Sequence, residues 1–362
     1  TFAEAPVDEA VMYAAEDADI TWRLYELLAP QLEAYGKVND VAQRMEWPLI
    51  PVLGDMECAG VELDVDFLAE FAKDINARLT KIEEQIGDLA GEKFNIASTQ
   101  QLKVILFDKL KIESAELKKI KTGVSTAAKE LEKLRGVHPI IDLLFEYRES
   151  AKLKSTYVDA LPLLVNASTG RVHTSYNQTI AQTGRLSSTN PNLQNIPVRT
   201  ELGREIRKAF VAAKGKVLVS ADYSQIELRL AAELAQDKPM IEAFKSGVDI
   251  HLLTAAEMFG VDPSQVTKQQ RSGAKTINFG VLYGMNPHGL SQATGMDYAE
   301  SRAFIDRYFE LRKGVADYID RIKKEAHQNG YTETIFGRRR PCPDVKSNNY
   351  IVRSAAERAA VN

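Results

Sequence analysis

The chain has 362 residues, of which 44% are hydrophobic and 27% are charged, and its formal net charge at pH 7 is −4. This composition is ordinary for a globular protein with large cores, and the length predicts two or three domains. The two cysteines, Cys58 and Cys342, exclude a disulfide framework and a cysteine metal cluster, which fits a reducing cytoplasm. No apolar stretch approaches the length of about 18 residues that a membrane helix needs, so we expect no membrane contact.

The charge is distributed unevenly along the chain. Residues 1–40 contain two Lys and Arg against nine Asp and Glu, whereas residues 265–362 contain 16 against 10. Phosphate binding requires a basic surface, and the positive excess lies in the C-terminal third. The negative net charge therefore does not argue against a nucleic-acid partner.

The first half of the chain is predicted to be helical. Residues 1–35 carry apolar side chains at helical spacing, and amphipathic helices with polar breaks follow to about residue 165, for example Val65–Leu89 and Ser125–Leu134. The stretch Lys109–Lys129 is rich in lysine and is broken at Thr122-Gly123, which predicts a tip between helices. Most lysines on such helices only solvate a face.

The pattern changes at Arg171, where alternating β-branched residues predict sheet, followed by a loop rich in Gly, Ser, Asn and Pro at Gln182–Pro197. Val217–Val219 has the aliphatic character of a buried strand, and Asp222 comes just past its end. A carboxylate there suits Mg²⁺, which prefers one or two carboxylates together with phosphate oxygens. Taken alone, Asp222 also fits a helix cap, because the apolar spacing becomes helical from Ile226.

Four side chains recur at every fourth position farther along the chain: Arg271, Lys275, Phe279 and Tyr283. Each step of four residues drifts by only about 40° on a helix, so these side chains share one face. Cations suit a polyphosphate, and flat rings suit a base or sugar stacked against them. Taken alone, the pattern also fits a solvated cationic edge beside two core aromatics.

These segments together resemble a known family. DYSQIELR at 222–229, R-x-x-x-K-x-x-x-F-x-x-x-Y-G at 271–284 and QTGRLSSTNPNLQNIP at 182–197 are similar to three motifs of the family A DNA polymerases, of the bacterial polymerase I type. The resemblance runs almost from end to end. It implies an α+β fold with a right-hand architecture, in which the thumb and fingers are mostly helical and the antiparallel palm sheet is incomplete.

The resemblance divides the chain into five parts. Residues 1–35 match the end of a 3′–5′ exonuclease domain, 36–165 the thumb, 166–225 the first part of the palm, 226–345 the fingers, and 346–362 the return to the palm. Tyr13 and Asp17 match the last exonuclease motif, but its earlier carboxylates are absent, so we expect no proofreading. The chain starts at Thr1 rather than Met and stops before the family's second metal carboxylate. We therefore expect a fragment that is inactive alone, from an active parent.

The family activity is template-directed addition of deoxynucleotides to a primer 3′-hydroxyl with two Mg²⁺ ions. The resemblance implies that Asp222 and the backbone carbonyl of Tyr223 bind metal, and that Asp222, Lys275 and Arg271 are catalytic. Arg271 and Lys275 would hold the β- and γ-phosphates. The implied nucleotide-binding residues are Tyr223, Gln225, Glu227, His251, Arg271, Lys275, Phe279 and Tyr283.

Three of these positions have further implied roles. Glu227 would exclude a ribose 2′-hydroxyl, and Phe279 would lie near the 3′ side of the sugar. His251 would contact the triphosphate, although an ordinary surface histidine fits nearly as well.

The partners implied are primer–template DNA and deoxynucleoside triphosphates, for a monomer in the bacterial cytoplasm that is associated with the nucleoid and serves replication and repair. Arg185 would contact the minor groove, where acceptors lie at similar positions in all base pairs. The GRRRP run at 337–341 is expected near phosphate or on the surface. The implied DNA contacts are Arg148, Lys152, Arg185, Gln194, Asn195, Tyr283, Arg358 and Asn362.

Two other interpretations stay open. A phage-type single-subunit RNA polymerase shares the Arg-Lys-Tyr-Gly helix, but it would have a small residue in place of Glu227. A non-catalytic fragment that binds primer–template DNA is the second. Primer extension with deoxynucleotides and ribonucleotides separates the two polymerases, and a gel shift with primer–template plus the extension assay separates binding from catalysis.

Overall fold

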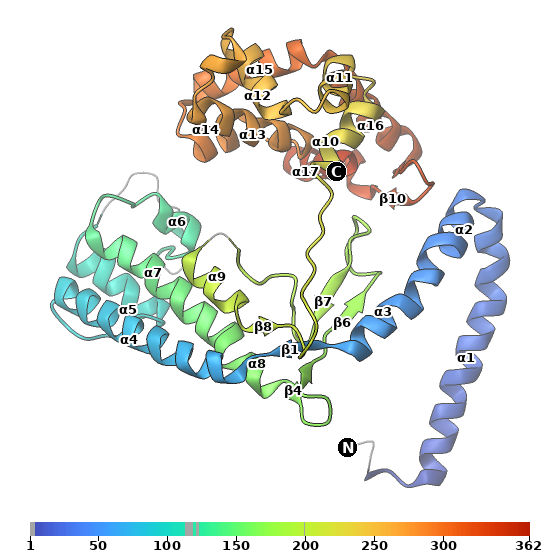
Figure 1. Ribbon diagram of the computed structural model, residues 1–362, viewed down its shortest axis with the longest axis horizontal. Helices are drawn as coiled ribbons and strands as arrows, with labels where there is room; N and C mark the ends of the chain where they lie inside the picture. The colour runs from blue at the N-terminus through green and yellow to red at the C-terminus, as the bar shows by residue number, and fades with distance from the viewer. Residues whose placement is uncertain (1–3, 113–118, 121–122, 199) are drawn as a thin grey trace. The chain divides into compact units, whose positions relative to one another are not determined.

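The computed structural model describes residues 4–112, 119–120, 123–198 and 200–362 (Figure 1). The chain folds into two compact units, one made of Thr1–Ile50 with Ser220–Asn362 and the other of Pro51–Val219. Part of the lysine-rich stretch Lys109–Lys129, residues 113–118 and 121–122, lies outside the described residues.

Long helices form the frame of the unit Pro51–Val219. Helix α4 (Val65–Ala90) begins where the Asp64 side chain accepts the backbone N–H of Phe67 at 2.8 Å, and it ends at Gly91, whose φ of 70° is left-handed. Figure 1 shows α4 beside α7 (Pro139–Leu153), and both helices contribute to one apolar core. The helix predicted at Val65–Leu89 is thus confirmed.

The other helices of this unit are short. α6 (Ala128–Glu132) is shorter than the predicted helix at Ser125–Leu134, because the Ser125 hydroxyl accepts the Ala127 N–H at 3.3 Å in a turn that precedes it. The remaining helical segments are α3 (Trp47–Ala59), which crosses the boundary at Ile50, α5 (Thr99–Lys103), the π-helical η3 (Val104–Lys109) and η4 (Lys154–Val158), α8 (Ala160–Leu163) and α9 (Glu201–Arg207).

A four-stranded antiparallel sheet closes the other end of this unit, in the order β4-β5-β1-β8. Leu63 and Val172 from the sheet are buried against Leu68 and Phe71 at the start of α4. A separate hairpin pairs β6 (Ser175–Asn177) with β7 (Ser187–Thr189), so part of the sheet predicted from Arg171 is confirmed. The other strands are β1 (Val61–Leu63), β2 (Lys119–Ile120), β3 (Gly123–Val124), β4 (Val165–Asn166), β5 (Arg171–Val172) and β8 (Phe210–Val211).

Helices also make up most of the other unit, as predicted for residues 226–345. Its main core gathers apolar side chains such as Leu228, Ile277 and Tyr308 from different helices. In chain order the elements are α1 (Val7–Ala34), α2 (Lys37–Val41), the π-helical η2 (Ala42–Glu46), α10 (Ile226–Leu234), α11 (Lys238–Lys245), α12 (Ile250–Phe259), η5 (Pro263–Gln265), α13 (Lys268–Leu282), α14 (Pro287–Thr294), α15 (Tyr298–Leu311), α16 (Lys313–Asn329), β9 (Tyr331–Glu333), β10 (Arg339–Pro341), η6 (Pro343–Lys346) and α17 (Tyr350–Val361).

The arginine run at 337–341 is used inside the protein. Arg338 forms an ion pair with Glu46 of η2, and Arg339 lies 3.1 Å from Glu333, which also pairs with Lys37 at 2.9 Å. The third arginine, Arg340, donates to the carbonyl of residue 359. These contacts hold the β9–β10 hairpin against α2, η2 and α17, and the arginine side chains stay partly exposed, which is consistent with the predicted surface position.

The strand predicted at Val217–Val219 is absent. The three side chains are 81, 65 and 84% exposed, and residues 216–223 have no regular secondary structure. Aliphatic residues favour a strand, but a strand forms only where a neighbour satisfies its backbone groups and covers its side chains. Asp222 therefore lies in an extended segment and not at the end of a paired strand, which corrects the prediction.

Candidate functional site

Helix α13 carries the cationic and aromatic residues that the sequence places on one face. Arg271 and Lys275 are exposed and Phe279 is half-buried, whereas Ala274 and Ile277 on the other side of the helix are buried. This distribution follows from the four-residue spacing, which keeps the charged heads on the solvent side. Tyr283 comes one residue after the helix ends, in the turn that follows.

Arg271 is held by a carboxylate from α12. Its Nε and Nη2 lie 2.8 and 2.6 Å from Oδ2 of Asp249. The other carboxylate oxygen, Oδ1, caps α12 by accepting the backbone N–H groups of His251 and Leu252. Partial burial alone would raise the pKa of Asp249, but the bonds from Arg271 and the two amides lower it below its ordinary value.

His251 is a buried residue, with 2% of its surface exposed, and not the surface histidine that the sequence left open. Its Nδ1 lies 3.0 Å from the side-chain nitrogen of Asn278 on α13, and its ring centroid lies 5.6 Å from that of Phe279. Burial lowers the pKa of His251; the positive charges of Arg271 and Lys275 lower it further, against the opposing charge of Asp249.

The turn after α13 connects to two other helices. The Tyr283 hydroxyl donates a hydrogen bond to Glu227 near the start of α10. Gly284 has a left-handed φ of 69°, and a Cβ built there would lie 2.6 Å from Cδ of Arg358 on α17. The structure therefore brings together six of the predicted site residues: Glu227, His251, Arg271, Phe279, Tyr283 and Arg358, with Lys275 on the same helix face.

The residues implied for metal binding precede α10. Asp222 and Tyr223 are exposed, and Gln225 adopts a left-handed φ of 54° at the start of the helix. Within the described part of the chain, no group of three or more His, Cys, Asp and Glu side chains lies close enough to hold a metal ion. Asp222 and the carbonyl of Tyr223 thus provide a partial donor set, which does not fit two ions.

The other residues implied for DNA binding lie in the unit Pro51–Val219, apart from Asn362 at the end of α17. Arg148 is half-buried and donates to the carbonyl of Thr126 at 2.9 Å, and this burial lowers its pKa. Lys152, Arg185, Gln194 and Asn195 are exposed, and the carbonyl of Asn195 accepts the Tyr157 hydroxyl at 2.6 Å. Tyr13 and Asp17 lie on α1, whose residues are largely exposed.

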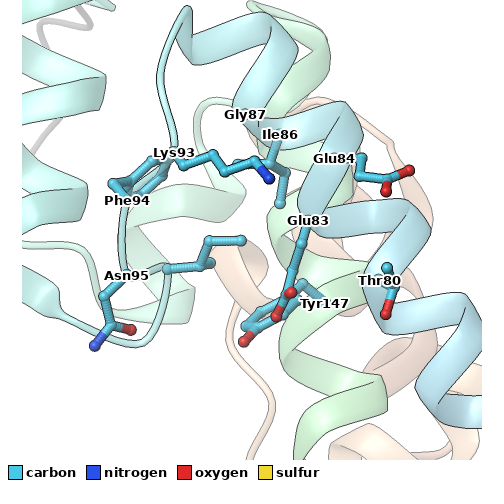
Figure 2. A pocket seen from close by; sticks show the side chains of 10 residues that line it. Thr80, Glu83, Glu84, Ile86, Gly87, Lys93, Phe94, Asn95 and Tyr147 are labelled. Carbon is cyan, nitrogen blue, oxygen red and sulfur yellow. The ribbon is translucent and has the colours of Figure 1, made fainter.

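A small pocket lies between α4, α7 and the loop after α4 (Figure 2). Its volume is about 240 Å³, and Lys93 and Phe94 line it from the loop. Figure 2 shows Glu83 of α4 directed toward Tyr147 of α7, and burial with the bond to Glu83 raises the pKa of Tyr147. None of the predicted site residues lines this pocket, so it is distinct from the face of α13.

Three residues of the site were missed by the sequence prediction: Asp249, Asn278 and Thr254, whose hydroxyl bonds to the Asn278 amide. Asp249 lies two positions before His251, and Asp before an apolar helical run is a cap signal that could have identified it. Nothing in the local pattern indicates that Asn278 faces His251, because that contact depends on how α12 packs against α13.

The chain is similar to characterised DNA polymerases. The family profile described as DNA polymerase family A matches residues 65–362. DNA polymerase I of Chloroflexus aurantiacus is 50% identical, over 100% of this chain and 39% of that protein. The thermostable DNA polymerase I of Thermus filiformis is 51% identical, over 96% of this chain and 42% of that protein. The chain thus spans about two fifths of these relatives.

A solved structure has the same fold. It is described as the POL domain of Pol1 from M. smegmatis in complex with DNA primer-template and dNTP, and it matches with a TM-score of 0.85 at 39% identity. The match covers 94% of this chain and 60% of that chain. None of the helices that the structure describes here is long and apolar enough to cross a membrane.

Proposed function

Because the chain belongs to DNA polymerase family A, we propose that it serves template-directed DNA synthesis, the addition of deoxynucleotides to a primer 3′-hydroxyl. The observation that carries the proposal is the face of α13, where two exposed cations and a half-buried ring lie beside the buried His251. This combination suits a nucleoside triphosphate, because the cations bind phosphates and the ring packs on the sugar.

Each residue around this face has a role in the proposal. Arg271 and Lys275 hold the β- and γ-phosphates, Lys275 gives a proton to the leaving pyrophosphate, and His251 donates a hydrogen bond to the phosphates. Phe279 packs near the 3′ side of the sugar, and Glu227 closes the space that a ribose 2′-hydroxyl would need. Tyr223, Gln225 and Tyr283 complete the nucleotide contacts, with Tyr283 beside the templating base.

We further propose that the reaction depends on magnesium. Asp222 and the backbone carbonyl of Tyr223 would be the protein ligands of the ion, which would bind substrate phosphate oxygens and neutralise their charge. Because these two donors are fewer than a two-ion site requires, we assign no step of the reaction to the metal in this chain.

The DNA partner is proposed to contact both units. Arg148 and Lys152 belong to the thumb (36–165), Arg185, Gln194 and Asn195 to the palm (166–225), and Arg358 and Asn362 to the palm return (346–362).

The two remaining parts of the chain are assigned in the same way: the fingers are residues 226–345, and residues 1–35 are the end of an exonuclease domain. We propose no proofreading by Tyr13 and Asp17, which lie on the exposed helix α1.

We propose a monomer in the bacterial cytoplasm, associated with the nucleoid and acting in replication and repair. A second candidate function is binding of primer–template DNA without catalysis. Among the described residues no group of three or more possible metal ligands includes Asp222, and this favours binding without catalysis. A single-subunit RNA polymerase is disfavoured by Glu227, and its preference for ribonucleotides would identify it.

The first test is calorimetric titration of 2′-deoxyadenosine triphosphate (dATP) into the 362-residue chain. Lys275→Ala should weaken binding by about tenfold or more, because a charge-assisted hydrogen bond contributes about 1.5–3 kcal/mol. Lys324→Ala, which removes an exposed lysine from α16, is the matched control and should bind like the wild type. Equal affinity in all three proteins would remove α13 from the site.

The second test is primer extension by a chimaera in which the flanking parts of the Chloroflexus aurantiacus relative complete this sequence. Extension with deoxynucleotides supports polymerase function. Binding of primer–template DNA by an inactive chimaera supports the non-catalytic candidate, and failure of both binding and extension rejects the proposal.

A further inference from the structure

Three buried polar side chains join α12 to α13 beside the candidate phosphate-binding face. His251 and Thr254 lie one turn apart on α12, and Asn278 lies on α13 next to Phe279. All three are at most 2% exposed. A side-chain amide that bonds to a buried histidine restricts where the ring proton can be.

The direction of the hydrogen bonds follows from the chemistry of the amide. The side-chain nitrogen of Asn278, Nδ2, lies 3.0 Å from Nδ1 of His251, and an amide nitrogen can only donate. Nδ1 must therefore accept, which leaves the ring proton on Nε2. The Thr254 hydroxyl lies 3.3 Å from the amide oxygen of Asn278 and 3.2 Å from its Nδ2, so it bonds to the amide without selecting the atom that faces His251.

We propose that Asn278 is a positioning residue that holds His251 as a neutral ring with its proton on Nε2, so that His251 meets the triphosphate as a hydrogen-bond donor and not as a cation. This proposal rests on the proposed function and assigns the recognition chemistry of one residue in it. Arg271 and Lys275 supply the positive charge, and His251 supplies a donor of fixed direction.

The charged groups around the ring are consistent with this assignment. Asp249 precedes His251 on α12 and favours a charged ring, whereas Arg271 and Lys275 on α13 and the burial itself disfavour it. Protonation of Nδ1 would in addition turn this ring nitrogen from an acceptor into a donor. Its N–H would then face the N–H of the Asn278 amide, and neither group could accept. The approach of an anionic triphosphate favours the imidazolium, and the Asn278 amide opposes that change.

The first experiment is nitrogen-15 NMR of the imidazole rings in the 362-residue chain without nucleotide. The sequence has only five histidines, so His251→Gln assigns the signal of interest. We expect an unprotonated Nδ1, a protonated Nε2 and a titration below the ordinary histidine range. A proton on Nδ1, or a titration at the ordinary pKa of about 6.5, would overturn the proposal.

The variant Asn278→Asp reverses the hydrogen bond, because a carboxylate accepts from Nδ1–H. The titration of His251 should then rise by about one to three pH units. Thr254→Val is the matched control, because the Thr254 hydroxyl bonds to both polar atoms of the amide and does not fix its orientation, so the His251 signal should stay like that of the wild type. Circular dichroism establishes that each variant is folded, and an unchanged His251 signal in Asn278→Asp contradicts the proposal.

The final arm is calorimetric binding of dATP by the same proteins across the pH range of the two titrations. The affinity of the wild type for dATP should not change with protonation of His251 at or above the ordinary histidine pKa. The affinity of Asn278→Asp should change with pH at the raised pKa of His251 in that variant. Identical pH profiles overturn the role toward the triphosphate. If the wild type binds no dATP, the proposed function fails, and the role of His251 toward the triphosphate fails with it. The position of the ring proton is decided separately, by the spectrum without nucleotide.

Discussion

Arg271 and Asp249 form an ion pair in which two guanidinium nitrogens, Nε and Nη2, bond to the same carboxylate oxygen at 2.8 and 2.6 Å. The cation that we propose for the triphosphate is thus already bound by an anion of the protein. The same Asp249 begins α12, so one side chain both places the helix that carries His251 and neutralises the first cation of α13. Phosphate oxygens must compete with this carboxylate or share the guanidinium with it.

Replacing Asp249 with Asn should strengthen dATP binding. Asn caps a helix about as well as Asp, so α12 keeps its start while the competing charge is lost. We expect affinity to rise by up to about fivefold, since a partly exposed ion pair contributes about 0.2–1 kcal/mol. Calorimetry on the 362-residue chain measures this, with Asp297→Asn, the cap of α15, as control. Weaker binding would mean that Asp249 orients Arg271 and does not compete for it.

The same ion pair should make stability depend on acid pH. The pKa of Asp249 is lower in the folded chain than its ordinary value, so its contribution is present above about pH 3.9 and disappears as the pH falls through the folded pKa. The difference in Tm between the wild type and Asp249→Asn should therefore be constant near neutral pH and should shrink below about pH 4. Thermal melts followed by circular dichroism give this difference, and its persistence at about pH 2 would refute the assignment.

In the chimaera, Asp222→Asn should abolish primer extension and leave primer–template binding nearly unchanged. The variant loses an anionic oxygen ligand in an exposed segment that no core depends on. Extension rates and gel-shift titrations measure the two effects, with Asp317→Asn on α16 as a control for the change of charge. Extension at the wild-type rate would remove Asp222 from the site.

Glu227→Ala should raise incorporation of ribonucleotides. Glu227 accepts the hydroxyl of Tyr283, which holds its carboxylate in place, so Tyr283→Phe should relax sugar selection in the same direction but less strongly. We expect a change of about tenfold or more for Glu227→Ala, which corresponds to about 1.4 kcal/mol. Competitive extension of the chimaera with rATP and dATP measures the ratio, and Glu233→Ala on the same helix is the control. An unchanged ratio would exclude Glu227 from sugar recognition.

Phe279→Tyr should reduce discrimination against dideoxynucleotides by about tenfold. The ring is half-buried beside His251, so a new phenol hydroxyl at its tip replaces the polar contact that the missing 3′-hydroxyl would have made. Such a hydrogen bond contributes about 0.5–1.5 kcal/mol. Competitive incorporation of dideoxy- and deoxynucleotides by the chimaera tests this, with Phe304→Tyr on α15 as control. If discrimination is retained, Phe279 is a packing residue.

Local sequence patterns determined much of this protein. The cap at Asp64 and the apolar stripe after it specify α4, and the four-residue spacing places Arg271, Lys275 and Phe279 on one face. Capping and periodicity act within one or two turns, so neither needs knowledge of the rest of the fold. The resemblance of three motifs likewise identified the family, which the match over residues 65–362 confirms.

Only the tertiary structure decided which side chains meet across elements. Arg271 finds Asp249, and His251 finds Asn278, because α12 packs against α13, and no local pattern encodes that packing. The segment Val217–Val219 shows the converse, since its aliphatic residues favour a strand but no described strand pairs with it. A helix satisfies its backbone groups within its own segment, whereas a strand or a buried polar side chain needs a partner from elsewhere in the fold.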